Sequence, residues 1–78
     1  MIVQVLGMGC AKCNALENKV KEVAEKNNLE ILLEKVTDFK KIMDYKVMMT
    51  PALVVDGVVK CTGRIPKDDE LLNWLKGE

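Results

Sequence analysis

The segment from Ala52 to Thr62 constrains the fold more than any other part of the sequence. Two apolar runs, Ala52–Val55 and Val58–Thr62, are separated by the pair Asp56-Gly57. Asp and Gly tolerate the positive φ angles that a two-residue type I′ turn requires. The segment therefore predicts an antiparallel β-hairpin, so two strands of the fold must be sheet neighbours.

The first half of the chain predicts a β-α-β unit. Met1–Leu6 is almost continuously apolar, and it is followed by glycines, as expected for a buried strand. From Ala11 to Lys26, apolar residues recur at spacings of three and four, which predicts an amphipathic helix. Leu29–Val36 has the length and the aliphatic content of a second strand.

Two further helices are expected on either side of the hairpin. Phe39–Tyr45 predicts a short helix capped by Thr37 or Asp38, with Phe39, Ile42 and Met43 on one face. Pro66–Leu75 predicts a terminal helix.

The elements therefore follow one another in the order β-α-β-α-β-β-α. Its first β-α-β unit should be parallel with a right-handed crossover, and the hairpin should add two antiparallel strands. This is an α/β fold in which a mixed four-stranded sheet is covered by helices on both faces.

The chain length and charge balance limit the classes of function. The 78 residues suffice for one core, so we expect a single domain over residues 1–78. Lys plus Arg and Asp plus Glu number 12 each, which gives no net field to attract nucleic acid or an anionic membrane. We therefore expect no nucleic-acid partner and no membrane partner. We also expect a monomer.

The cysteines define the candidate chemistry. The N-terminal sequence MIVQVLGMG has neither a basic signal region nor a membrane span, so we expect a cytoplasmic protein. Cytoplasmic thiols are kept reduced, and a close pair such as Cys10 and Cys13 is therefore catalytic or metal-binding rather than structural. The pair also lies at the carboxyl end of the first strand, where open sheets form their sites.

Two cysteines three residues apart at a helix N-terminus suit disulfide exchange. Their Cα atoms can approach to about 5–6 Å, the separation that a disulfide prefers. The helix dipole favours a thiolate on Cys10, which becomes the nucleophile, while Cys13 lies one turn further on and resolves the mixed disulfide. The spacing alone also suits a zinc or copper site, or two buried thiols on an ordinary helix.

The chain resembles small archaeal or bacterial thioredoxin/glutaredoxin-like proteins, the redox-active disulfide proteins. The resemblance spans nearly the whole chain and rests on Cys10-Ala11-Lys12-Cys13, Met49-Thr50-Pro51 and Asp56-Gly57. It implies a thioredoxin-like fold and a thiol–disulfide oxidoreductase without a cofactor or a metal. It also implies a disulfide-containing protein substrate, with a reductase or a glutathione-type compound as the reductant.

The resemblance further assigns a substrate site. It implies that Pro51 is cis and faces the dithiol, and that Thr50 offers backbone groups to the substrate. From the residues alone, a trans proline at a strand start is the simpler expectation. Met8 and Met49 flank the dithiol, and with Gly9 they complete the expected substrate-binding residues.

The chain departs from the family pattern in three places. Ala11-Lys12 replaces the middle residues of both the thioredoxin motif WCGPC and the glutaredoxin motif CPYC. Gln4 stands six residues before Cys10, where thioredoxins hold a buried carboxylate, so we expect no such proton relay. The glutathione-binding segment of glutaredoxins is only faintly echoed by Gly63-Arg64 and Asp68-Asp69.

A rival function comes from a second resemblance. Gly7-Met8-Gly9-Cys10-Ala11-Lys12-Cys13 is similar to the GMxCxxC copper loop of heavy-metal-associated domains, and two thiolates would suit Cu(I). Those domains run β-α-β-β-α-β, however, and the second half of this chain favours the redox function.

Several other residues are expected to be structural. Cys61 should be a small buried residue of the last strand. Met8, Met48 and Met49 could fill gaps in the core, although Met8 and Met49 are also candidates for an adaptable substrate surface.

Overall fold

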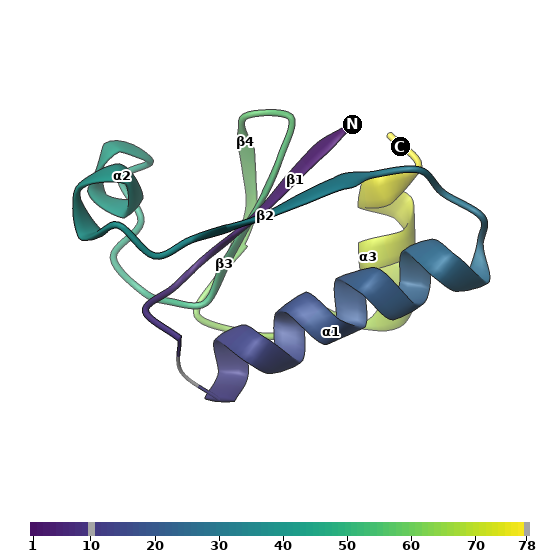
Figure 1. Cartoon of the computed structure of the whole chain (residues 1–78), viewed down its shortest axis with the longest axis horizontal. Helices are drawn as coiled ribbons and strands as arrows, with labels where there is room; N and C mark the ends of the chain where they lie inside the picture. Colours follow the sequence, from purple (N-terminus) through teal and green to yellow (C-terminus); the bar gives the residue numbers. More distant parts are fainter. Residues whose placement is uncertain (10, 78) are drawn as a thin grey trace.

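The computed structural model describes residues 1–9 and 11–77, and its elements follow the order expected from the sequence (Figure 1). In chain order, they are β1 (Ile2–Leu6), α1 (Ala11–Lys26), β2 (Leu32–Val36), α2 (Phe39–Asp44), β3 (Ala52–Val55), β4 (Val58–Thr62) and α3 (Asp68–Leu75). Among the helices of the described residues, none has the length and apolar content needed to cross a bilayer.

The strands form a mixed sheet in the order β2-β1-β3-β4. β1 pairs in parallel with β2 and antiparallel with β3, and β3 pairs antiparallel with β4. The parallel first unit and the antiparallel hairpin are therefore confirmed. β1 lies inside the sheet, as its apolar composition predicts, because both its edges are hydrogen-bonded.

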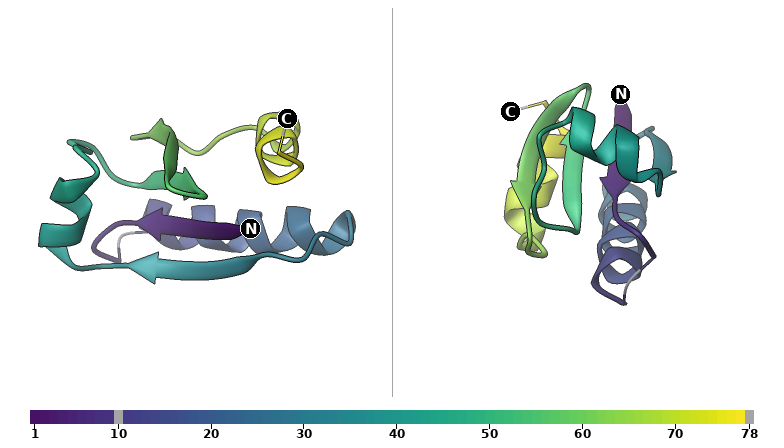
Figure 2. Two further views of the ribbon diagram at one scale, coloured as in Figure 1. Left: turned by 90° about the horizontal axis from the view of Figure 1, so that it is seen from above. Right: turned by 90° about the vertical axis from the view of Figure 1, so that its left-hand side faces the viewer.

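Successive side chains of the central strands point to opposite faces of the sheet, and they form two cores, one on each face. Val3, Val5 and Leu53 pack with α1 and α3, whereas Leu6 and Val54 pack with the α2 side. Figure 2 shows α1 and α3 close together and α2 apart from them. Because side chains point alternately to the two faces of a strand, each short strand contributes to both cores.

The hairpin has the expected turn and one irregularity. Asp56 and Gly57 have φ angles of 48° and 84°, as a type I′ turn requires. The Asp56 carboxylate accepts a hydrogen bond from the Ile2 backbone N–H at 2.7 Å, which ties the turn to the start of β1. Leu53 pairs with Cys61 but Val54 pairs with Val59, so Lys60 is an extra residue in a β-bulge.

Three expected boundaries were wrong by a few residues. β2 begins at Leu32 rather than Leu29, because the Leu29 N–H donates to the Ala24 carbonyl in the turn that ends α1. α3 begins at Asp68 rather than Pro66, and its capping residue is Lys67. α2 ends at Asp44, with Tyr45 as its C-terminal cap.

Only one of the three apolar residues on the expected face of α2 is buried. Ile42 is 3% exposed, but Phe39 and Met43 are 65% and 49% exposed. The six-residue helix rests on the sheet through Ile42, and Val47 from the following segment completes that core. A short helix therefore does not bury the whole apolar face that its spacing suggests.

Candidate active site

Cys13 lies in the first turn of α1 and is buried, with 2% of its surface exposed. It packs against Gly7, the residue directly after β1, so closely that a Cβ built on Gly7 would overlap the Cys13 Sγ atom. The Gly7 N–H donates to the Val36 carbonyl at 3.0 Å, which fixes Gly7 at the carboxyl ends of β1 and β2. The structure therefore brings the Cys13 sulfur to the edge of the sheet where the sequence predicted a site.

The Thr50–Pro51 peptide bond lies beside the same glycine, and it is cis. The Thr50 Cβ is 3.9 Å from the point that a Gly7 Cβ would occupy, so Thr50 and Cys13 approach Gly7 together. Pro51 is fully buried, and its carbonyl accepts a hydrogen bond from the Gly63 N–H at 2.8 Å. The cis isomer implied by the family resemblance is confirmed, whereas the trans isomer favoured by the residues alone is not found.

Three methionines close in sequence to Gly7 and to Thr50 are exposed. Met8, Met48 and Met49 are 65%, 94% and 63% exposed, so the expectation that they fill gaps in the core was wrong. Met49 contacts Gly63, whose φ of 70° and missing side chain leave room for it. The flexible, polarisable side chains of Met8 and Met49 are thus accessible to a partner.

The remaining residues of the motif have different positions. Gly9 has a φ of 85°, a conformation that favours glycine, and it turns the chain toward α1. Lys12 is exposed. Cys10, the expected nucleophile, lies outside the described residues, and Ala11 directly after it is the first residue of α1.

Gln4 makes hydrogen bonds with neighbouring side chains. Its amide accepts from the Tyr45 hydroxyl at 2.7 Å and donates to the Glu34 carboxylate at 3.3 Å. Gln4 carries no charge and cannot exchange a proton near neutral pH as a carboxylate can. The residue at the position of the thioredoxin carboxylate is therefore committed to holding α2 and β2 against β1.

Cys61 is part of the core on the α1 side, as expected, and is 7% exposed. Burial raises the pKa of its thiol, and the positive charge of Arg64 offsets part of that effect. Its Sγ lies 3.9 Å from the Arg64 carbonyl oxygen. A buried neutral thiol of this kind is a poor nucleophile.

Two glycines were not identified as site residues from the sequence. Gly7 and Gly63 each make room for a neighbouring sulfur-containing side chain, that of Cys13 and that of Met49. The available signal was a glycine at the point where a buried strand leads into a helix that begins with cysteines, because close approach to a backbone commonly requires glycine.

The arrangement differs from that implied by the copper-loop resemblance. A helix, α2, separates β2 from β3, and a helix follows β4, so the order is not β-α-β-β-α-β. Within residues 1–9 and 11–77, no group of three His, Cys, Asp or Glu residues is placed to hold a metal ion.

Comparison with known proteins agrees with this geometry. Residues 1–76 match the model of the thioredoxin domain family. The chain belongs to the thioredoxin family, and it is a thiol–disulfide oxidoreductase of the class that acts on disulfide-containing proteins.

Two curated archaeal relatives, both named thioredoxin, are similar over nearly the full chain. One, from Methanocaldococcus jannaschii, is 33% identical over 76 residues, which cover 97% of this chain and 87% of the relative. The other, from Methanothermobacter thermautotrophicus, is 31% identical over 75 residues, covering 96% of this chain and 97% of the relative.

Proposed function

We propose that the chain reduces protein disulfides through Cys10 and Cys13, with Cys10 as the nucleophile and Cys13 as the resolving thiol. The observation that carries this proposal is the packing around Gly7. The Cys13 sulfur lies against Gly7 and Thr50 approaches the same glycine, so the second cysteine of the motif adjoins the cis-proline segment. A redox-active cysteine beside this segment can act on a substrate disulfide while the segment contacts the chain that carries the disulfide.

In the proposed reaction, the Cys10 thiolate attacks one sulfur of the substrate disulfide. A Cys10–substrate disulfide forms, and the other substrate sulfur leaves as a thiolate that takes up a proton. The position of Cys10 directly before α1 supports this role, because the N-terminus of a sixteen-residue helix favours a thiolate.

Cys13 then completes the transfer. Its thiol loses a proton and attacks Cys10 Sγ, which forms the Cys10–Cys13 disulfide and releases the second substrate thiolate to be protonated. One substrate disulfide is reduced to two thiols, and one dithiol of the enzyme is oxidised. Because Gln4 cannot accept the Cys13 proton, that proton passes to solvent or to the leaving substrate thiolate.

The substrate chain is proposed to lie along Thr50 and Pro51, with Met8, Gly9 and Met49 at its sides. The exposure of Met8 and Met49 supports this placement. A bound substrate would remove their apolar surface from water, which favours binding. We further propose that residues 1–78 act as a monomeric single domain in the cytoplasm, with a reductase or a glutathione-type thiol regenerating the dithiol.

Trapping experiments test the order of the two cysteines. Cys13→Ser should accumulate a mixed disulfide between Cys10 and a model substrate, such as a peptide with one internal disulfide, detected as an added mass under non-reducing conditions. Cys10→Ser should give neither turnover nor an adduct. Equal trapping by both variants would overturn the assigned order.

A control variant and a redox titration complete the test. Cys61→Ser leaves the motif intact and should retain disulfide reduction. Equilibration of the wild-type chain in a dithiol buffer should give one reversible two-electron transition, which the Cys10→Ser variant lacks. A wild-type chain without such a transition that instead binds Cu(I) tightly would favour the metal-binding alternative.

A further inference from the structure

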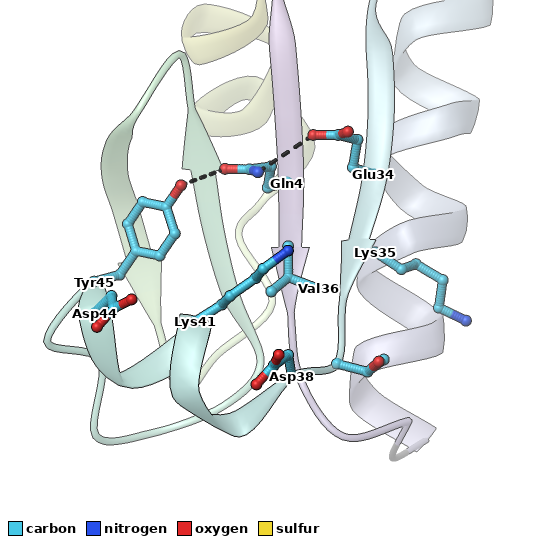
Figure 3. A pocket seen from close by; sticks show the side chains of 9 residues that line it. Gln4, Glu34, Lys35, Val36, Asp38, Lys41, Asp44 and Tyr45 are labelled. Atoms are coloured by element: carbon cyan, nitrogen blue, oxygen red, sulfur yellow. Dashed lines mark hydrogen bonds between the residues drawn. The ribbon is translucent and has the colours of Figure 1, made fainter.

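A pocket on the α2 side of the sheet lies outside the proposed redox site. Its volume is about 570 Å³, within the range of small-molecule sites. Figure 3 shows its side chains projecting from β1, β2 and α2. The lining residues are Gln4, Glu34, Lys35, Val36, Thr37, Asp38, Lys41, Asp44 and Tyr45, and none of them is a proposed catalytic or substrate-binding residue.

One wall of this pocket is held rigid by hydrogen bonds. The Tyr45 hydroxyl donates to Gln4, and Gln4 in turn donates to the Glu34 carboxylate (Figure 3). The three side chains come from β1, from β2 and from the residue that caps α2, so this wall is formed in advance of any ligand. A preformed wall lowers the entropic cost of binding.

Some charged side chains of the lining already have partners within the protein, and others do not. The Lys35 ammonium lies 3.2 Å from Glu17, and the Asp38 carboxylate caps α2 by accepting from the Lys40 N–H. In the part of the chain that the structure describes, Glu34, Lys41 and Asp44 form no ion pair.

These groups define a complementary ligand. Three carboxylates line the pocket, from Glu34, Asp38 and Asp44, together with the ammonium groups of Lys35 and Lys41. Lys35 is held by Glu17, which also pairs with Lys21, so Lys41 is the lining cation without an ion pair among the described residues. A ligand that matches them carries one anionic group and more than one cationic group. Val36 and the ring of Tyr45 offer apolar contact for a short aliphatic chain between those groups.

We propose that this pocket binds a basic α-amino acid. The α-carboxylate would pair with Lys41 and the α-ammonium with Asp44, while the side-chain ammonium would pair with Glu34. The aliphatic chain would lie over Val36 and Tyr45. The pocket is open, so the ion pairs remain partly solvated, and we expect weak, salt-sensitive binding.

Amide chemical shifts of the ¹⁵N-labelled full chain test the proposal with three matched probes. L-lysine carries all the proposed groups, cadaverine lacks the carboxylate, and L-norleucine lacks the side-chain ammonium. L-lysine should cause saturable shifts at Gln4, Glu34 and Tyr45, and each of the other probes should bind more weakly, by up to about fivefold, as expected for loss of one solvated ion pair. Equal affinity for L-lysine and L-norleucine, or shifts confined to other surfaces, would overturn it.

Substitutions in the pocket test the contact of Lys41 with the ligand carboxylate and that of Glu34 with the ligand ammonium separately. Lys41→Met should abolish the preference for L-lysine over cadaverine, and Glu34→Gln should reduce the preference for L-lysine over L-norleucine. Lys40→Met is the matched control, because Lys40 is an exposed lysine of α2 that does not line the pocket. If Lys40→Met weakened L-lysine binding as much as Lys41→Met, the contact would be general surface charge and the proposal would be wrong.

Discussion

The Cys13 sulfur fills the space beside Gly7 that a side chain at position 7 would occupy. This contact joins the end of β1 to the first turn of α1. Because the Gly7 N–H is also bonded to Val36 of β2, the position of the sulfur depends on the carboxyl ends of two parallel strands. The geometry of the proposed resolving thiol is thus set by a residue that has no chemical role of its own.

Gly7→Ala tests that contact. The new methyl group would overlap the Cys13 sulfur, so α1 or the cysteine must move, and overpacking of this kind typically costs about 1–3 kcal/mol of stability. We expect a lower urea midpoint and slower reduction of a disulfide peptide.

The control for this substitution removes the sulfur. In a Cys13→Ala background, the loss of stability caused by Gly7→Ala should shrink, because the closest overlapping atom is gone. An unchanged loss in both backgrounds would mean that position 7 is sensitive for another reason, such as its backbone conformation.

The order of elements was predictable because each depends on local chemistry. The turn at Asp56-Gly57 needs only residues that accept positive φ, and α1 needs only apolar residues at helical spacing. Exposure depends on what packs against an element, and this explains the error for Phe39. Its spacing from Ile42 is helical, but Ile42 is the one buried residue of the six in α2.

Asp38→Ala tests the start of α2. The Asp38 side chain accepts from the Lys40 N–H at 2.9 Å, and loss of such a cap typically costs about 0.5–2 kcal/mol. Asp38→Asn keeps an acceptor and should lose much less. Urea unfolding measures both variants, and equal losses would show that the carboxylate charge matters rather than the cap.

The candidate site was less predictable than the fold. The position of Cys10 and Cys13 after the first strand could be inferred from the sequence, but the contact of Thr50 with Gly7 joins segments more than forty residues apart. The cis bond before Pro51 was expected only through the family resemblance, since no local feature of an X-Pro pair determines its isomer.

Glu70 should make stability depend on acidic pH. Hydrogen bonds from Arg64 and from the Lys67 N–H hold the pKa of this carboxyl below its usual range. Its stabilising effect is therefore present above the pKa of the unfolded chain and is lost as the pH falls through the lower, folded value. When the pH is lowered from about 7 to about 3, the free energy of unfolding should fall less for Glu70→Gln than for the wild type.

Arg64→Met provides a check on the cause of that dependence. It removes the paired guanidinium and leaves the Glu70 carboxyl, so it should reduce the acid sensitivity toward that of Glu70→Gln. Urea midpoints at both pH values measure the difference. Wild-type acid sensitivity in the Arg64→Met variant would assign the effect to other carboxyls.

Cys61 should act in the opposite direction, at alkaline pH. Burial raises the pKa of its thiol, so the folded chain holds this proton at pH values where the unfolded chain has released it. The stabilising effect is present below the unfolded pKa and is lost as the pH rises toward the folded value. Cys61→Ala should be less stable than the wild type at neutral pH, because it leaves a cavity. The difference in free energy of unfolding between the two chains should become smaller between about pH 8 and pH 10.5. Cys10 and Cys13 are common to both chains, so their titrations cancel in this difference. A gap that stays constant across that range would show that the Cys61 thiol titrates alike in the folded and unfolded chains.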